Sequence, residues 1–252
     1  ELREELQLKD NSREYFLVYK DPLYYEIEGP KRIEIISRRA IPKTSTRKYD
    51  YGYQLKLNNQ SVTINHSKRI YDEVTSKDHP GHGYTYSGNC IVTIPSGNHV
   101  LTISPKKKGK PVLVRVLEKL YPKLEGIVHH LHPVENKNSI SLTISEKRRQ
   151  YFILSIENPI NIAIENPGII AVYGRYGFDT ESVDFANYQI QVLENGNPGN
   201  ILVEFAARNN FNKSKSRIGQ FEIMEGQQNI SFQLVDSFTP VYLRILEYVV
   251  YE

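Results

Sequence analysis

Apolar and polar residues alternate in short runs along most of this chain. The runs at 53–57 (YQLKL) and 188–192 (YQIQV) place an apolar side chain at every second position. A period of two is typical of a β-strand that buries one face. Neither half of the chain contains a convincing amphipathic stretch of helical period. The pattern therefore predicts an all-β protein, with about seven or eight short strands in each half.

Several of these segments occur twice. The matching pairs are 22–30 with 159–167, 94–103 with 223–232, and 111–118 with 240–247. Self-similarity at a fixed period indicates duplication of a structural unit, and the length suits two domains that each bury a core. We therefore expect the two halves to superpose, with Glu28 over Glu165 and Arg115 over Arg244.

Each repeat is predicted to form a β-sandwich, because sheets with one wet face bury the other by packing face to face. The fold class is two tandem β-sandwiches, jelly-roll or immunoglobulin-like, from an internal duplication. The expected parts are an N-terminal extension at 1–11, a sandwich at 12–120, a linker at 121–147 and a sandwich at 148–252. Residues 1–11 could form a helical turn or two, the end of a linker, or an edge strand.

One hairpin pattern carries a resemblance. Ile94–Ile103 and Ile223–Phe232 share an apolar residue, a glycine three positions later and an alternating apolar run after it. Tandem sandwiches with this hairpin resemble jelly-roll or immunoglobulin-like accessory modules of bacterial surface and secreted proteins. The resemblance implies that the chain binds glycans, binds other proteins, or spaces other domains apart. It assigns no binding residue.

Composition narrows the setting of the protein. The chain has 18 Tyr, nine Phe and no Trp, and no apolar run approaches the ~18 residues that a membrane span needs. It begins at Glu1 without Met, so we expect a mature or truncated product, and this start neither shows nor excludes secretion. The expected location, outside the cell, in the periplasm or on the cell surface, is a separate prediction. The lone Cys90 excludes an internal disulfide and is predicted to be a buried core residue.

Charge is unevenly distributed along the chain. Residues 1–120 hold 21 Lys and Arg against 14 Asp and Glu (net +7), and residues 121–252 hold 11 against 15 (net −4), which together give the formal +3. Opposite charges could favour docking between the domains or head-to-tail association of copies, or could reflect drift between duplicated modules. The modest total argues against a nucleic-acid partner.

The first repeat is predicted to carry most of the partner-binding surface. It combines the positive charge with closely spaced tyrosines, which can stack on a ligand. The candidate ligand-binding residues are Tyr49, Tyr51, Tyr53, Tyr84, Tyr86, Arg47, Lys106, Lys107, Lys108 and Lys110. The alternative is that the tyrosines cover a sheet and that the lysines solubilise a turn.

Recurring charged residues are expected to be structural. A catalytic pair is seldom needed twice, so Glu28 and Glu165 are predicted to pair with arginines across strands. The arginines concerned are Arg38, Arg175, Arg115 and Arg244. Arg115 and Arg244 share a strand face with apolar residues, so these two arginines should be partly buried and paired.

Histidines are the weak candidates for metal ligation. His79 and His82 flank a Pro-Gly turn and could converge on one ion, but the second repeat has no counterpart. We predict that they hold no metal and that the chain needs no cofactor. No nucleophile motif or glycine-rich phosphate loop is present.

The sequence thus favours a non-catalytic structural or interaction protein of the cell envelope or extracellular space, acting in assembly, adhesion or scaffolding. Its expected partner is another protein or a second copy. The first alternative is a carbohydrate-binding protein that uses the Tyr-rich surface of the first repeat. The second alternative is a hydrolase whose carboxylates the sequence does not reveal.

Overall fold

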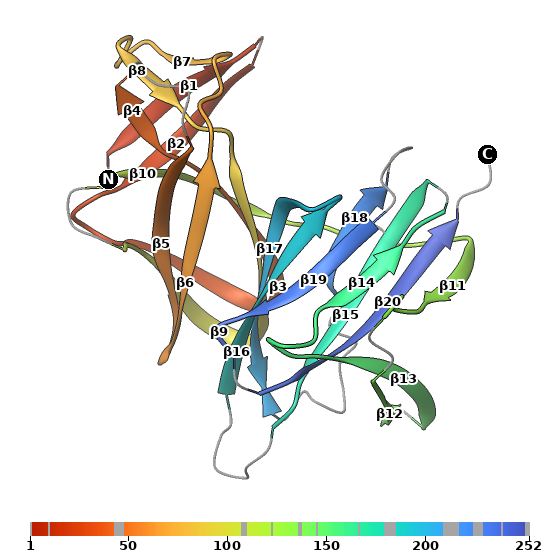
Figure 1. Cartoon of the computed structure of the whole chain (residues 1–252). Helices are drawn as coiled ribbons and strands as arrows, with labels where there is room; N and C mark the ends of the chain where they lie inside the picture. Colours follow the sequence, from red (N-terminus) through yellow and green to blue (C-terminus); the bar gives the residue numbers. More distant parts are fainter. Residues whose placement is uncertain are drawn as a thin grey trace. The chain divides into compact units, whose positions relative to one another are not determined.

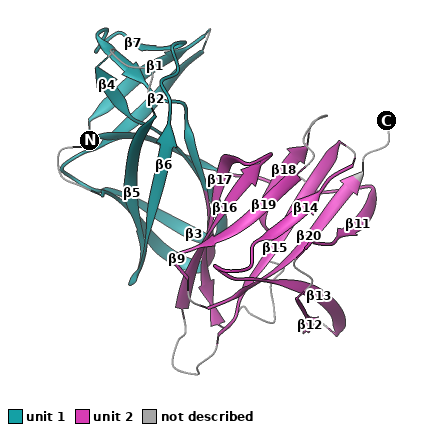
Figure 2. Ribbon diagram, in the orientation of Figure 1, with its two compact units in different colours: residues 1–90, 96–118 teal, residues 91–95, 119–252 magenta. Residues whose placement is uncertain are grey.

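The computed structural model describes residues 2–9, 11–42, 48–106, 110–121, 123–135, 138–144, 146–165, 167–178, 185–208, 217–223, 229–237 and 239–249. These residues form β-strands joined by turns, with no α-helix among them, so the predicted all-β class is confirmed (Figure 1). No helix in the described part is long and apolar enough to cross a membrane. The chain divides into two compact units, residues 1–90 with 96–118 and residues 91–95 with 119–252 (Figure 2).

The strands of unit 1 form one continuous series of hydrogen-bonded neighbours and a small two-stranded sheet. The series runs β7-β1-β2-β10-β3-β9-β5-β6, and β4 pairs with β8. The strands are β1 (Arg3–Leu8), β2 (Asn11–Val18), β3 (Leu23–Arg38), β4 (Ala40–Pro42), β5 (Tyr49–Leu57), β6 (Gln60–Lys68), β7 (Val74–Ser76), β8 (His82–Tyr84), β9 (Gly88–Pro105) and β10 (Val112–Glu118).

The alternating side chains of β5 face the inside of unit 1. Tyr51, Tyr53 and Leu55 are buried, while Gln54 and Lys56 between and beyond them are exposed. The hydroxyl of Tyr51 donates to the carbonyl oxygen of Ser37 at 2.9 Å, so β5 packs against β3. A second apolar cluster joins strands β1, β2, β7 and β10 to β8. Its buried members are Leu6, Tyr15, Val74, Tyr84 and Leu113.

Unit 2 is a sandwich of two sheets. One sheet has the order β14-β19-β16-β17 and the other β12-β13-β20-β15-β18, with β11 also paired to β20. Buried residues from both sheets form one apolar core that includes Phe152, Val172, Ile190 and Phe232. The strands are β11 (Ile127–Leu131), β12 (Ser139–Ile144), β13 (Lys147–Leu154), β14 (Ile160–Ala163), β15 (Gly168–Tyr176), β16 (Phe185–Glu194), β17 (Asn197–Ala207), β18 (Arg217–Ile223), β19 (Asn229–Val235) and β20 (Val241–Val249).

Strand registers within the two units correspond. In unit 1, Leu113 of β10 lies opposite Arg38 of β3 and Leu17 of β2. In unit 2, Tyr242 of β20 lies opposite Arg175 of β15 and Ile153 of β13. These partners are the ones that the sequence repeat aligns. The duplication itself stays a prediction, and the shared register supports it.

Two short hairpins show the same agreement. β5 and β6 are joined at Asn58, whose φ is 53°, and β16 and β17 at Asn195 and Gly196, whose φ values are 48° and 78°. Asn and Gly tolerate this left-handed conformation, which tight hairpins require. The turn residues in both repeats therefore fix where each pair of strands begins to separate.

Two segments expected outside the sandwiches contribute strands. Residues 3–8 form strand β1, and not a helical turn or the end of a linker. The strand lies between β2 and β7, not at the edge of the sheet. Within 121–147, β11 pairs with β20 and β12 pairs with β13. Hydrogen bonding to neighbouring strands satisfies backbone groups that a free linker would leave to water.

Candidate functional site

A buried arginine stands at the end of β3 in unit 1. Arg38 is 5% exposed, its Nε donates to the hydroxyl of Tyr15 at 3.4 Å, and its Nη1 donates to the carbonyl oxygen of Thr85 at 2.6 Å. Both acceptors are neutral, and within the described ranges Arg38 forms no ion pair. Burying a charge without an opposite charge is costly, so neighbouring dipoles and rings must stabilise this guanidinium.

Thr85 organises the backbone around this arginine. Its N–H donates to the carbonyl oxygen of Arg39 at 3.1 Å, and its Oγ1 accepts from the Arg39 N–H at 3.0 Å. On its other side Thr85 forms an isolated antiparallel bridge with Ile70. The N–H of Tyr71 donates to the carbonyl oxygen of Tyr84, and that of Tyr86 to Arg69, each at 2.8 Å. This pairing brings residues 69–71 alongside residues 84–86.

The pairing stacks two tyrosines near the arginine. The ring centroids of Tyr71 and Tyr86 are 4.4 Å apart with planes 25° from parallel, and Tyr86 is 50% exposed. The Arg38 guanidinium lies 6.0 Å from the Tyr71 ring centroid, within the range of a cation–π contact. We name Arg38, Tyr71 and Tyr86 the tyrosine–arginine site. It offers an exposed ring face beside a buried positive charge.

Polar neighbours hold the site in place. The Tyr71 hydroxyl donates to Glu73, whose carboxylate also pairs with Lys9 at 3.3 Å. Next to the buried arginine, Arg39 lies 5.6 Å from the Tyr49 ring centroid and donates to the carbonyl oxygen of Asp50 at 2.9 Å. The carboxylate of Glu73, which contacts Tyr71, is therefore already paired with the ammonium of Lys9.

A second polar cluster in unit 1 is centred on Glu4. This buried carboxylate accepts from the Tyr84 hydroxyl and lies 3.1 Å from His79 Nδ1, while the rings of His79 and His82 stack with centroids 5.1 Å apart. Burial raises the pKa of Tyr84, and the hydrogen bond to Glu4 adds to this effect. No group of three or more metal-ligating side chains occurs in the described parts of the chain. The cluster ties β1 to the residues around β8.

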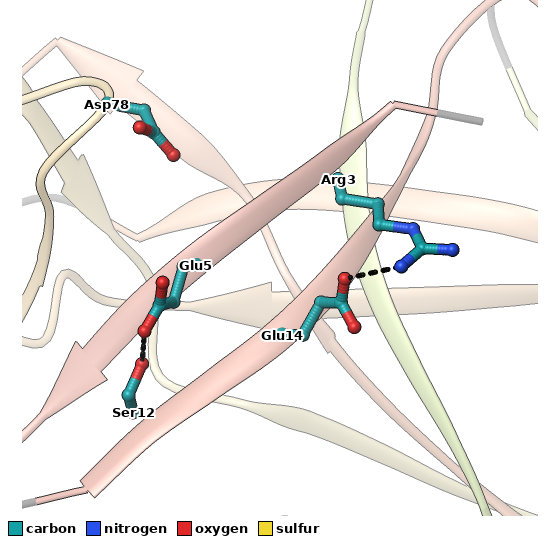
Figure 3. Close-up of a pocket in the computed structure, with 5 residues that line it drawn as sticks. All are labelled: Arg3, Glu5, Ser12, Glu14 and Asp78. Atoms are coloured by element: carbon teal, nitrogen blue, oxygen red, sulfur yellow. Dashed lines mark hydrogen bonds and ion pairs between the residues drawn. The ribbon is translucent and has the colours of Figure 1, made fainter.

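A hollow of about 490 Å³ lies over β1 and β2 (Figure 3). Glu5 and Glu14 are direct cross-strand partners, but each is engaged by a neighbour, Ser12 bonding Glu5 and Arg3 pairing with Glu14 at 3.0 Å. Asp78 lies apart from these contacts on a separate segment (Figure 3). Both glutamates are exposed, whereas a carboxylic acid that donates a proton near neutral pH is usually desolvated. The hollow therefore offers charged groups without the environment that acid catalysis needs.

The predicted ligand-binding tyrosines separate into buried and accessible groups. Tyr49, Tyr51 and Tyr53 share a face as expected, but that face is the core side of β5, where Tyr51 is 5% exposed and Tyr53 0%. Tyr84 is also buried, so the rings of Tyr51, Tyr53 and Tyr84 cannot stack on a ligand. Tyr86 is exposed and Tyr49 partly so. The prediction placed the shared tyrosine face of β5 toward a ligand, but this face is buried. Alternation alone does not show which face of a strand is exposed.

The predicted cations are only partly within the described ranges. Lys106 and Lys110 are exposed, and the Lys106 ammonium donates to Asn65 at 2.6 Å. Arg47, Lys107 and Lys108 lie outside the described residues. A contribution of these lysines to binding stays a prediction.

The predicted glutamate–arginine pairs are not formed. Glu28 and Glu165 lie at exposed positions, next to the buried Ile27 and Ile164, and neither forms an ion pair within the described ranges. Arg38 and Arg175 are buried, and they bond to the hydroxyls of Tyr15 and Tyr151. Arg115 and Arg244 are half-buried, and Arg244 Nε is buried without a hydrogen-bond partner. The two glutamates project on the solvent side of their strands, out of reach of the core arginines.

Two members of the site were missed by sequence reasoning. Tyr71 was passed over because it stands outside the alternating tyrosine run, and Arg38 was assigned a purely structural role. The available signal was the recurrence of Arg38 as Arg175 at the matching place of the second repeat.

No protein-family model matches the chain, and no curated protein matches it. Among solved structures it is similar to the tandem CBM51 modules of a family 98 glycoside hydrolase from Streptococcus pneumoniae, with a TM-score of 0.29 and 14% identity over 98% of this chain and 88% of that chain. It is also similar to the catalytic domain and two CBM51 domains of a Clostridium perfringens protein (TM-score 0.31, 7% identity, 98% and 36% covered). A third neighbour is the ANX2 ectodomain from Arabidopsis thaliana (TM-score 0.28, 10% identity, 94% and 83% covered).

These neighbours include carbohydrate-binding modules and an ectodomain. The predicted resemblance to β-sandwich accessory modules is confirmed at the level of architecture. The likeness is one of architecture and assigns no ligand or site. Function must come from the chain's own residues.

Proposed function

We propose that the chain is a non-catalytic binding module that recognises a saccharide through the tyrosine–arginine site of unit 1. The observation that carries the proposal is the half-exposed ring of Tyr86, stacked on Tyr71 beside a buried guanidinium. A stacked ring is held in one orientation, so little entropy is lost when its free face meets a flat ligand. Sugar rings present such flat apolar faces, with hydroxyls for polar neighbours.

The size of the aromatic surface favours a small ligand over a large apolar interface. A stable protein–protein interface buries about 800 Å² on each partner and centres on several anchoring side chains. Within the described part of this region, Tyr86 is the one tyrosine ring that is as much as half exposed, and charged or polar residues surround it. One ring face bordered by polar groups suits a saccharide.

The absence of a catalytic role is part of the proposal. The most strongly perturbed groups of the described chain lie in the cores, since burial raises the pKa of Tyr53, Cys90 and Tyr188 and lowers that of His66 to about 3. Perturbed groups mark active sites when they also border a cleft. These side chains are buried in the interior, and burial is the largest cause of each shift, so the shifts are better explained by packing.

The experiment is affinity electrophoresis of the full chain through gels that contain neutral or acidic polysaccharides. Retardation by at least one polysaccharide, lost in Tyr86→Ala and kept in Tyr24→Ala, is the expected result. Tyr24 is the matched control because it is an exposed tyrosine of unit 1, with 63% of its surface accessible, and lies at the opposite end of β3 from Arg38. Equal migration of the wild type and Tyr86→Ala in every gel, or shortening of the polysaccharide, would contradict the proposal.

Protein assembly is a second candidate, favoured by the edge strand β6. β6 spans nine residues, and β5 is its one hydrogen-bonded neighbour among the strands described. Long edge strands can add a strand from another chain, and opposite charges on the two halves could orient such association. Light scattering that shows salt-sensitive self-association would support this candidate. An extracellular, periplasmic or cell-surface location stays our prediction for either function.

A further inference from the structure

We infer that the saccharide bound at the tyrosine–arginine site is anionic, and that its carboxylate pairs with Arg38 while a sugar ring stacks on Tyr86. The inference rests on the proposed function and deepens it by naming the ligand class. Uronic-acid oligosaccharides have this combination of a flat ring and a carboxylate.

The first argument is the incomplete coordination of Arg38. A guanidinium has five N–H donors, and two of its nitrogens are engaged by Tyr15 and Thr85. Within the described residues, the third nitrogen, Nη2, has no hydrogen-bond acceptor. A carboxylate oxygen at Nη2 would supply both the missing acceptor and the missing negative charge. Charged hydrogen bonds of this kind are stronger than neutral ones.

The second argument is a comparison with the corresponding arginine of unit 2. Arg175 is also 5% exposed and also donates from Nε to a buried tyrosine hydroxyl, that of Tyr151, at 3.3 Å. There, however, Tyr188 donates to the buried carboxylate of Glu204. Burial raises the pKa of Tyr188, Glu204 raises it further and Arg175 lowers it, so both charges act on this hydroxyl. Unit 2 therefore carries its own counter-charge.

Unit 1 has a neutral side chain at the matching position. Tyr51 lies six residues before the end of β5 and pairs with His66, as Tyr188 lies six before the end of β16 and pairs with Glu204. Burial, reinforced by Lys68, lowers the pKa of His66 to about 3. His66 is therefore uncharged near neutral pH. Unit 1 keeps the buried arginine and lacks the carboxylate that unit 2 places beside the matching tyrosine, Tyr188.

The surrounding charge favours an anion as well. Residues 1–120 hold 21 Lys and Arg against 14 Asp and Glu, a net charge of +7. Arg39 is adjacent in sequence and partly exposed, and Lys9 offsets Glu73 at the rim. An excess of positive charge raises the rate at which anionic ligands meet the surface, and this steering weakens as salt is added.

The test is calorimetric titration of the full chain with oligogalacturonide and oligoalginate, each compared with its methyl ester. Esterification keeps the sugar rings and removes the charge. We expect at least one acid to bind about tenfold or more tightly than its ester, the scale of one charge-assisted hydrogen bond. Tyr86→Ala should weaken both forms, and Arg38→Gln should make acid and ester equal. Arg175→Gln is the matched control and should leave the acid-to-ester ratio unchanged.

The outcomes separate the two levels of the proposal. An ester that binds as tightly as its acid, with both weakened by Tyr86→Ala, overturns the anionic ligand and leaves saccharide binding standing. Binding that Tyr86→Ala does not affect overturns both. Failure of both acids to bind overturns the inference, while the gel experiment still decides the proposed function. If Arg38→Gln does not fold by circular dichroism, the acid-to-ester comparison on the wild-type chain decides.

Discussion

Two arginines are buried among the described residues, Arg38 and Arg175, and their charges have different neighbours. Arg175 in unit 2 shares its tyrosine cluster with the buried carboxylate of Glu204, and Arg38 in unit 1 stands beside the neutral His66 cluster and the accessible Tyr71 ring. Strand register is the same around both. The difference teaches that an ordinary structural cluster can become a binding site when one charged partner is replaced and an exposed ring lies nearby.

The largest expected effect is the loss of the counter-charge in unit 2. Glu204→Leu leaves the Tyr188 hydroxyl without its acceptor and Arg175 without its neighbouring negative charge, so the free energy of unfolding should fall by about 3–5 kcal/mol. Urea unfolding followed by circular dichroism measures it. His66→Leu, the matched change in unit 1, should cost about 1 kcal/mol or less because no charge pair is broken. Equal losses in the two variants would remove the distinction between the clusters.

The next effect is the acid sensitivity of unit 1. Folded protein holds His66 neutral down to about pH 3, whereas the unfolded chain takes up a proton near its ordinary pKa of about 6.5. Stability from this group is complete above about pH 6.5 and is lost as the pH falls toward 3, amounting to roughly 3 kcal/mol between pH 6.5 and 4. The stabilities of wild type and His66→Phe should be similar near neutral pH and diverge in acid, where the wild type becomes the less stable of the two. His130, whose pKa burial lowers to about 4, is common to both proteins and cancels in the difference.

A smaller effect is expected where a glycine makes room for His66. A Cβ at Gly88 would lie 2.4 Å from the His66 ring, so Gly88→Ala must displace that ring at a cost of about 1–3 kcal/mol. Adding His66→Ala should remove most of this cost, and a double-mutant cycle in urea measures the coupling. Additive losses would mean that the ring is not what excludes the methyl group.

The smallest effect on stability is expected at the binding ring. Tyr86→Ala removes a half-exposed side chain and should change the free energy of unfolding by about 0.5 kcal/mol or less, while saccharide binding is lost. Thermal unfolding of this variant beside Tyr24→Ala checks that any loss of binding does not come from unfolding. A large drop in stability for Tyr86→Ala alone would give the ring a structural role instead.

Alternation and repetition were sufficient to predict the architecture. The run at 53–57 places Tyr53, Leu55 and Leu57 on one face, and the Asn58 and Asn195 turns end strands where polar residues break the pattern. Strand identity depends on local periodicity, which the sequence contains. The orientation of β5 toward the core depends on which other strands cover it, and this is a long-range property.

The candidate site was harder to predict for the same reason. Arg38 is far in sequence from Tyr71 and Tyr86, and long-range contacts of Thr85 with Ile70 and with Arg38 bring them together. Neither Ile70 nor Thr85 is marked by periodicity or by a motif. Neither the burial of Arg38 nor its lack of a carboxylate partner could be predicted from local sequence, because both depend on which strands pack around β3.

The central claim is that unit 1 binds an anion because it lacks the carboxylate that unit 2 carries. The direct measurement is the acid-to-ester affinity ratio, by calorimetric titration with oligogalacturonide or oligoalginate, of wild type and His66→Glu. The substitution places a carboxylate at the position that corresponds to Glu204. A ratio that falls from about tenfold to near one, in a chain that circular dichroism shows to be folded, is the predicted result. A folded His66→Glu variant that keeps the wild-type preference for the acid would contradict the account.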